Sequence, residues 1–293
     1  MKLLKTMVLL HVVLAVLLVT GCGGQQVRHK SSVVDYLYPN SADLTVKPSV
    51  PKLNVPIDVG VAFVPSQASD TSGMSYWKGR NNIGTTLTEA KKIELLESIA
   101  SHFAQYEFVR NIEIIPSAYL THGGGFDNLK QIQTMYGVDV IALVSYDQIQ
   151  FTDEGMLSLS YWTIVGAYVF TGEKNDTSTL IDTVVYDISS KKMLFRAPGT
   201  SLIKGSSTPV NLSEELRDDS VKGFEVATQE MITNLDLQLG VFREKIKKRP
   251  EDVQITYSPS YSGGGGALGL LDILLLLAVP VFFNVRKRLK KTV

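Results

Sequence analysis

The chain contains a single reactive thiol, on Cys22, at the end of an apolar segment. With one cysteine in 293 residues, no intramolecular disulfide can form, even in an oxidising compartment. Lys2 and Lys5 precede the segment, and residues 7–19 are apolar apart from His11. This pattern is typical of a secretory signal peptide and is short for a membrane span. The chemistry to expect at Cys22 is therefore linked to processing of the N-terminus.

The residues around this thiol resemble the lipobox of bacterial lipoproteins. They read Val19-Thr20-Gly21-Cys22, with small side chains before the cysteine. The resemblance implies a palmitate-bearing lipid anchor on the Cys22 sulfur and cleavage by signal peptidase II between Gly21 and Cys22. It also implies transfer to the outer membrane, because Gly23 rather than Asp follows the cysteine. The alternative is a cysteine that follows an ordinary signal peptide or an N-terminal helix.

A second membrane-directed signal lies at the C-terminus. Residues 267–285 carry a single charge, on Asp272, and a helix of this length spans about 28 Å, enough to cross a hydrocarbon core. Glycines 263–266 before it each disfavour helix by about 1 kcal/mol relative to Ala, and Asp272 costs a few kcal/mol at mid-membrane depth. A cluster of basic residues follows and is expected to stay in the cytoplasm: Arg286, Lys287, Arg288, Lys290 and Lys291.

The glycine motif (Gly263, Gly264, Gly265 and Gly266), the apolar helix and the basic tail together resemble the GlyGly sorting signal of Gram-negative bacteria. That signal is associated with rhombosortase, a rhomboid-type intramembrane serine protease, which needs a substrate helix that unwinds easily. With the lipobox, the chain resembles the rhombotarget lipoprotein family. The resemblance implies three kinds of partner: lipoprotein-processing enzymes, a rhombosortase-type protease and the membrane. The alternative is a plain C-terminal anchor, which would make the chain a doubly anchored inner-membrane lipoprotein.

The body between the two signals is acidic, although the whole chain is neutral. The chain has 29 basic and 29 acidic residues, of which seven basic and one acidic lie in the terminal signals. Residues 22–264 therefore carry a net charge of about −6, which argues against nucleic acid or anionic lipid as a main partner.

Composition divides the chain into six predicted segments. They are a signal peptide (1–21), a flexible tether (22–55), an α/β periplasmic domain (56–248), a linker rich in Pro, Ser and Gly (249–266), a transmembrane helix (267–285) and a cytoplasmic basic tail (286–293).

The predicted domain is an α/β fold in which helices pack on a mixed sheet, in the order β-α-β-α-β-β-β-β-α. Residues 140–144 are nearly all apolar, which predicts a central strand. Periodicity places strands at 57–64, 111–115, 138–149, 157–170, 180–186 and 193–201, and helices at 86–105, 127–135 and 213–247.

Few residues of the body have a recognisable chemistry. His122-Gly123-Gly124-Gly125 resembles the oxyanion loop of α/β-hydrolases, but the chain has no Gly-x-Ser-x-Gly elbow. A turn that uses glycine for positive φ is expected instead. Asp182 and Asp187 flank a strand at a spacing that places them on opposite sides. His29 and His102 are far apart in sequence, and no metal site or cofactor is expected.

These observations predict an envelope lipoprotein, lipid-anchored and with its body in the periplasm or on the cell surface. The outer membrane is favoured over the inner membrane after processing. The body is expected to be a non-catalytic binding or assembly-accessory module. The alternative from another class is an envelope hydrolase whose site is assembled from residues distant in sequence, which a concave pocket holding a nucleophile beside a base would indicate.

The C-terminal signal leads to a test that separates sorting from anchoring. Replacing glycines 263–266 by alanine should stabilise the helix by up to about 4 kcal/mol, so cleavage should slow, and Asp272→Leu should act in the same direction. With an epitope tag at the C-terminus, immunoblotting should show that the wild-type protein loses the tag and the alanine variant keeps it. A wild-type protein that retains its tag in its native host would mean that the tail is only an anchor.

Overall fold

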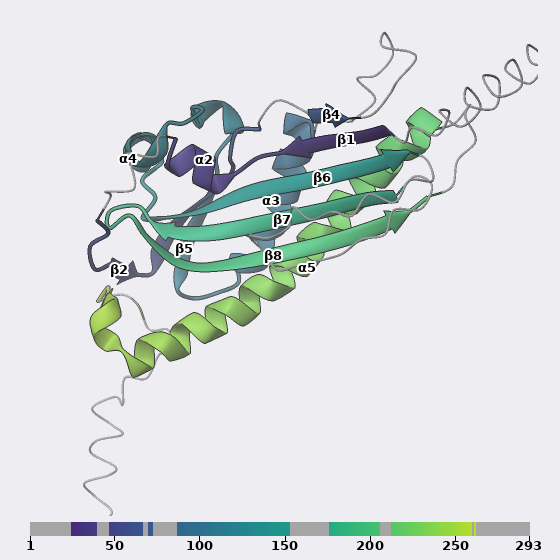
Figure 1. The fold of residues 1–293 in the computed structure, drawn as a ribbon. Coiled ribbons are helices and arrows are strands. Elements are labelled where there is room, and N and C mark those ends of the chain that lie inside the picture. The colour runs from purple at the N-terminus through teal and green to yellow at the C-terminus, as the bar shows by residue number, and fades with distance from the viewer. Residues whose placement is uncertain are drawn as a thin grey trace, which may run out of the picture. The chain divides into compact units, whose positions relative to one another are not determined.

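The computed structural model describes residues 25–39, 47–66, 70–72, 87–152, 176–205, 212–259 and 261 (Figure 1). The chain divides into two compact units, residues 1–257 and 258–293. In the described part of the first unit, seven strands form one mixed sheet and helices cover both of its faces. This architecture confirms the predicted α/β class with helices packed on a mixed sheet, but the described order contains further strands and one further helix beyond the predicted β-α-β-α-β-β-β-β-α. The predicted strand at 157–170 lies outside the described residues.

Strand β6 (Val140–Thr152) is the centre of the sheet, as its apolar run predicts. Its first half pairs in parallel with β3 (Ile57–Phe63), and its second half pairs antiparallel with β1 (Gln25–Lys30). Both share one edge of β6, because β7 (Asp176–Asp187) pairs along the other edge. The sheet continues outward through β5 (Val109–Ile114) next to β3, β4 (Asp70–Ser72) next to β1, and β8 (Lys192–Lys204) next to β7.

The two faces of the sheet carry separate cores. Helices α3 (Glu89–Phe103) and α5 (Leu212–Lys248) cover one face, where Phe63 and Val144 pack with Phe224 and other buried residues. Helices α2 (Val33–Leu37) and α4 (Gly125–Tyr136) cover the other, around Leu143 and Leu129. Alternation along β6 sends neighbouring side chains to opposite cores, so the continuous apolar run is used on both sides.

Helix α5 lies very close to the edge strand β8. A Cβ placed on Gly199 would lie 2.1 Å from the Ala227 carbonyl oxygen and 2.4 Å from the Met231 amide nitrogen, so only glycine fits there. Side chains of α5 also satisfy backbone groups of β8. The Thr200 amide donates to the Glu230 carboxylate at 2.6 Å, and the Asn234 amide donates to the Pro198 carbonyl at 2.7 Å. The helix thereby covers an edge that would otherwise be open to pairing with another strand.

The first half of α5 is joined to the sheet by buried polar side chains. The Ser220 hydroxyl donates to Gln148 at 2.5 Å, and the Gln148 amide donates to Thr179 at 2.8 Å. The Gln150 amide donates to the carbonyl of Leu216 at 2.6 Å. Because these glutamines are almost fully buried, each bond avoids the cost of an unpaired polar group in the core.

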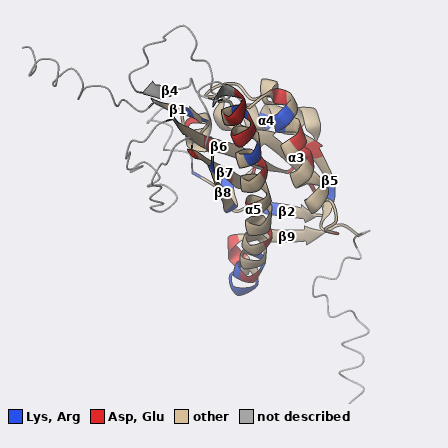
Figure 2. Ribbon diagram, turned by 90° about the vertical axis from the view of Figure 1, so that its right-hand side faces the viewer, with Lys and Arg blue, Asp and Glu red and all other residues tan. Residues whose placement is uncertain are grey.

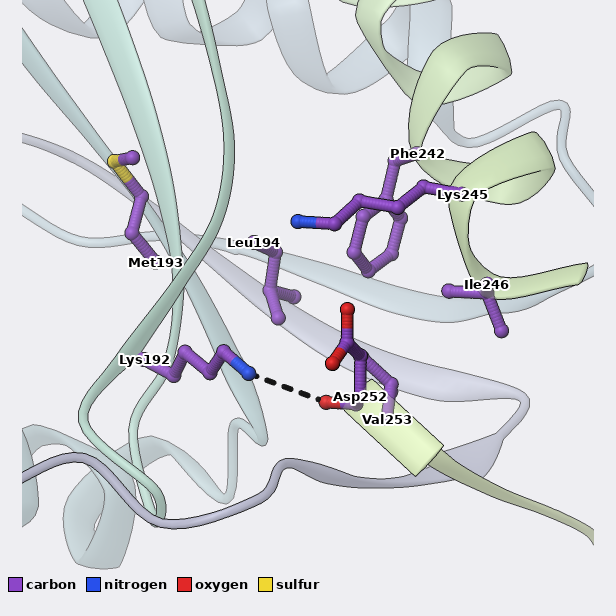
Figure 3. A pocket seen from close by; sticks show the side chains of 8 residues that line it. All are labelled: Lys192, Met193, Leu194, Phe242, Lys245, Ile246, Asp252 and Val253. Atoms are coloured by element: carbon purple, nitrogen blue, oxygen red, sulfur yellow. Dashed lines mark hydrogen bonds between the residues drawn. The ribbon is translucent and has the colours of Figure 1, made fainter. Parts of the chain in front are cut away.

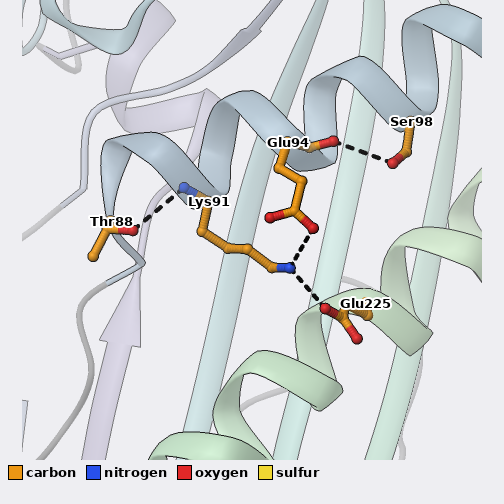
Figure 4. A network of polar contacts seen from close by, with 5 residues as sticks. All are labelled: Thr88, Lys91, Glu94, Ser98 and Glu225. Carbon is orange, nitrogen blue, oxygen red and sulfur yellow. Dashed lines mark hydrogen bonds and ion pairs between the residues drawn. The ribbon is translucent and has the colours of Figure 1, made fainter.

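Helices α3 and α5 are linked near both ends of α3. Lys91 Nζ lies 2.7 Å from Glu94 and 2.7 Å from Glu225 of α5 (Figure 4). At the other end, His102 and the hydroxyl of Tyr106 both contact the Asp236 carboxylate at 2.8 Å. The contacts of Lys91 and of His102 with α5 each join residues 134 positions apart, so the two helices run in the same direction.

The predicted tether and linker are partly wrong, because both contain strands. Within 22–55, β1 pairs with β6 along six residues, and Arg28 of β1 donates to Asp147 at 2.8 Å. Strand β2 (Lys52–Val55) pairs in parallel with β9 (Gln254–Tyr257), which lies in the predicted linker. The folded body therefore extends from residue 25 to 257 rather than from 56 to 248. Polar strands of this kind are held by backbone hydrogen bonds and give little periodic signal.

The close approach at Gly199 predicts a large effect for a small substitution. Gly199→Ala should lower the free energy of unfolding by about 3 kcal/mol, because the new methyl group meets backbone atoms that cannot move independently. Gly240→Ala, in helix α5 itself, is the matched control. No atom lies within 4 Å of its added Cβ, so it should stabilise α5 by about 1 kcal/mol. Urea unfolding of residues 22–257 followed by circular dichroism measures both, and equal effects would contradict the packing described.

Candidate functional site

The processing residues predicted at the two ends lie outside the described residues: Cys22, Gly263–Gly266, Asp272 and the basic residues of 286–293. The structure does show where the described body begins and ends relative to these residues. Strand β1 begins three residues after Cys22, and β9 ends at Tyr257, six residues before Gly263. In the described part of the chain, no helix is both long and apolar enough to cross a membrane. The predicted span at 267–285 is not in that part.

The glycine run after His122 forms a tight turn that leads into α4, as expected. Gly123 and Gly125 have φ of 63° and 59°, values that other residues rarely adopt. The Gly124 amide donates to the Thr121 carbonyl at 2.9 Å within the turn, so it is not directed at a ligand. The turn interpretation is therefore confirmed, and the oxyanion-loop alternative loses one of its donors.

The two predicted strand carboxylates have separate structural roles. Asp182 accepts from Arg196 Nε at 2.7 Å, and burial raises the pKa of Asp182 although the guanidinium acts in the opposite direction. Asp187 accepts from the Ser190 amide at 2.8 Å and closes the turn between β7 and β8. They do not form an acid–base pair. Within the described ranges, no three His, Cys, Asp or Glu side chains are grouped to hold a metal ion.

One cluster with a possible chemistry is not visible in the sequence. Ser117, on the turn after β5, donates its hydroxyl to Glu89 of α3 at 2.5 Å, and Lys92 Nζ lies 3.4 Å from the same hydroxyl. Burial alone would raise the pKa of Glu89, but the hydrogen bonds from Ser117 and the charge of Lys92 outweigh it and lower that pKa. A hydroxyl that donates to a carboxylate also has the geometry of a base-activated nucleophile. Here the lowered pKa makes Glu89 a weak base, and the Ser117 backbone amide donates to the same carboxylate at 2.8 Å, so the contact is better explained as a structural tie.

A small depression lies where the last turns of α5 meet β8 and the segment before β9 (Figure 3). Its apolar lining includes Leu194, Phe242 and Val253, and two lysines, Lys192 and Lys245, stand beside it. Lys192 Nζ donates to the backbone carbonyl of Asp252 at 3.3 Å. The remaining lining residues are Met193, Ile246 and Asp252. The lining contains no serine, threonine, cysteine or histidine, so the depression offers no hydroxyl or thiol nucleophile, and its ionisable side chains are two lysines and one carboxylate.

Charge is distributed unevenly along α5. Its first turn carries Glu214 and Glu215, and its last turn carries Lys245, Lys247 and Lys248. In Figure 2 the ribbon of this helix is red near its start and blue in its last turns, with red residues also close to the blue ones. The acidic first turn and basic last turn complement the helix dipole. We call the exposed C-terminal turns of α5, with Lys192 of β8, the basic end of the body.

No protein-family model matches the sequence, and no curated protein matches it. Similar solved structures include a PelC dodecamer from Paraburkholderia phytofirmans (TM-score 0.27, 14% identity, 62% of this chain and 94% of that chain). Protein XCC0632 from Xanthomonas campestris gives a TM-score of 0.32 at 10% identity, over 69% and 95% of the two chains. Lipoprotein GNA1162 from Neisseria meningitidis gives 0.23 at 11% identity, over 59% and 96%. Because these TM-scores are low, the function of the chain is argued from its own residues.

The contacts of Ser117 predict how it behaves toward a serine-directed reagent. A fluorophosphonate should leave Ser117 unlabelled, because Glu89, whose pKa is lowered, is too weak a base to activate the hydroxyl that it binds. Ser117→Ala should lower the free energy of unfolding by about 1 kcal/mol, the usual net value of one hydrogen bond. Mass spectrometry after exposure to the reagent, together with urea unfolding, checks both. Covalent labelling at Ser117 that the alanine variant abolishes would instead favour the hydrolase alternative.

Proposed function

We propose that this chain is an envelope lipoprotein that is processed at both ends and whose mature body is a non-catalytic binding or assembly-accessory module. In this proposal Cys22 receives the lipid, and the signal peptide is cut after Gly21. A rhomboid-type sorting protease then removes the C-terminal helix, and the body remains at the outer membrane or cell surface.

The observation that carries the proposal is the position of the one cysteine. Cys22 follows a signal-like segment directly and is the only thiol in the chain. Strand β1 begins at Gln25, so a lipid on Cys22 would be joined to the central sheet through two intervening residues. The lipid would then hold the body close to the membrane rather than at the end of a long tether.

The proposed processing at the C-terminus is supported by the chain that follows β9. The folded body ends at Tyr257, and the four consecutive glycines begin at Gly263. A protease acting near these glycines would meet no strand or helix of the described body. Cleavage there would release the anchor without disturbing the β2–β9 pair.

A non-catalytic role is supported by the chemistry of the described residues. The depression at the basic end has no serine, threonine or cysteine among its lining residues. The Ser117 hydroxyl, which does lie beside a lysine and a carboxylate, is engaged with Glu89. The buried glutamines Gln148 and Gln150 are satisfied by α5 and β7. In the described part of the body, the depression therefore does not combine a hydroxyl or thiol nucleophile with a histidine base.

The lipid attachment is tested by removing the thiol. Cys22→Ser should abolish incorporation of labelled palmitate and leave a precursor that keeps its signal peptide, because the lipid is attached through that sulfur. Labelling in the native host followed by gel electrophoresis measures both outcomes. Since a serine hydroxyl is close in size to the thiol it replaces, folding of the body should be unaffected, as a thermal unfolding control can establish. Normal palmitate labelling of the variant would exclude the lipoprotein assignment.

A further inference from the structure

The two points where the chain leaves the body lie at opposite ends of α5. At one end, Val27 of β1 pairs with Gln150, whose side chain bonds the Leu216 carbonyl near the start of α5. At the other end, Ile246 lines the same depression as Val253, just before β9. The thirty residues from Leu216 to Ile246 span about 45 Å of helix at 1.5 Å per residue.

The connections to the two proposed anchors are shorter than this separation. Cys22 lies three residues before Gln25, which allows at most about 10 Å of extended chain. The predicted membrane helix begins ten residues after Tyr257, which allows about 35 Å. A body standing on either end would hold its other attachment point out of reach of the same membrane. While both anchors are in place, α5 therefore cannot stand upright on the membrane, and the connection of about 35 Å limits its inclination to about 50°.

The surface of α5 at its C-terminal side, close to where the chain continues toward the predicted membrane helix, is amphipathic. Leu237 and Val241 are 62% and 61% exposed, and they lie on the same side of α5 as Lys245 and Lys248, at helical spacings of four and three residues. Both lysines are exposed, as are three other basic residues nearby: Arg243, Lys247 and Arg249. Apolar side chains flanked by cations suit the interface of an anionic membrane.

Acidic groups around the basic end limit the area on which anionic lipid can bind. Glu244 pairs with Lys247, and Glu251 and Asp252 lie in the next turn, so residues 243–252 keep five basic against three acidic side chains. The first turn of α5 is acidic, and the body as a whole is negative. The net charge of the body therefore disfavours anionic lipid, and the basic end is a local exception.

We infer that the basic end of α5, with Leu237 and Val241, is a docking surface for anionic phospholipid headgroups. The inference rests on the proposed function, because the anchors are what bring this surface close to a membrane. Cleavage of the C-terminal anchor leaves the surface in place, so docking adds to the lipid on Cys22 in holding the body at the membrane.

The experiment uses the full chain, with lipid and C-terminal tail, reconstituted into vesicles of phosphatidylcholine alone or with phosphatidylglycerol. Hydrogen–deuterium exchange compares peptides covering residues 237–257 with peptides from α4. Phosphatidylglycerol should slow exchange at 237–257 only, and high salt should reverse the effect. Lys245→Gln with Lys248→Gln should weaken docking roughly 30-fold, from about 1 kcal/mol for each lysine.

The matched control removes two exposed cations from the other end of the same helix, as Arg217→Gln with Lys222→Gln, and should leave the protection unchanged. Flotation of the vesicles distinguishes the docking surface on α5 from the two membrane anchors of the proposed function. A chain that floats with both lipids but shows equal exchange in both would overturn the docking surface and leave the anchors standing. A chain that floats only with phosphatidylglycerol would support docking without anchors. A chain that floats with neither would overturn both.

Discussion

The contact between α5 and β8 is the constraint on which the rest of the body depends. At Gly199 the helix backbone comes so close to the strand that no side chain fits between them. This approach lets Glu230 and Asn234 satisfy the open edge of β8, and it fixes the line along which the helix runs. It also carries Ser220 and Leu216 over β6, where they pair with the buried glutamines Gln148 and Gln150. The length of α5 in turn separates the two ends of the body.

Much of the fold follows from periodicity, and the remainder depends on contacts that have no local pattern. The apolar run at 140–144 predicted the central strand, and the helical spacing of apolar residues predicted α3, α4 and α5 close to their observed ranges. Strands β1 and β9 were missed because they are polar and are held by pairing with distant strands. The tie between Ser117 and Glu89 joins residues 28 positions apart, and no spacing rule indicates it.

The candidate sites also divide into those that a local sequence pattern predicts and those that form only where distant segments meet. The glycine turn at 123–125 was predicted because positive φ has a local cause, and both outer glycines show it. The depression beside Phe242 and Lys192 was not predicted, because it forms where three distant segments meet. The proposed processing sites are local patterns at the two ends, and they stay predictions of the sequence. The structure of the body adds two facts that the terminal motifs do not contain. They are the length of α5 and the change from acidic to basic residues along it.

The central claim is that both ends of the chain are processed and that Cys22 carries lipid. The intact mass of the protein extracted from the membrane of its native host tests both ends in one measurement. The account predicts a species that lacks residues 1–21 and the C-terminal helix and carries the mass of acyl chains on its first residue. A species that retains the helix beyond residue 267 would contradict sorting, and one without added lipid mass would contradict the lipoprotein assignment itself.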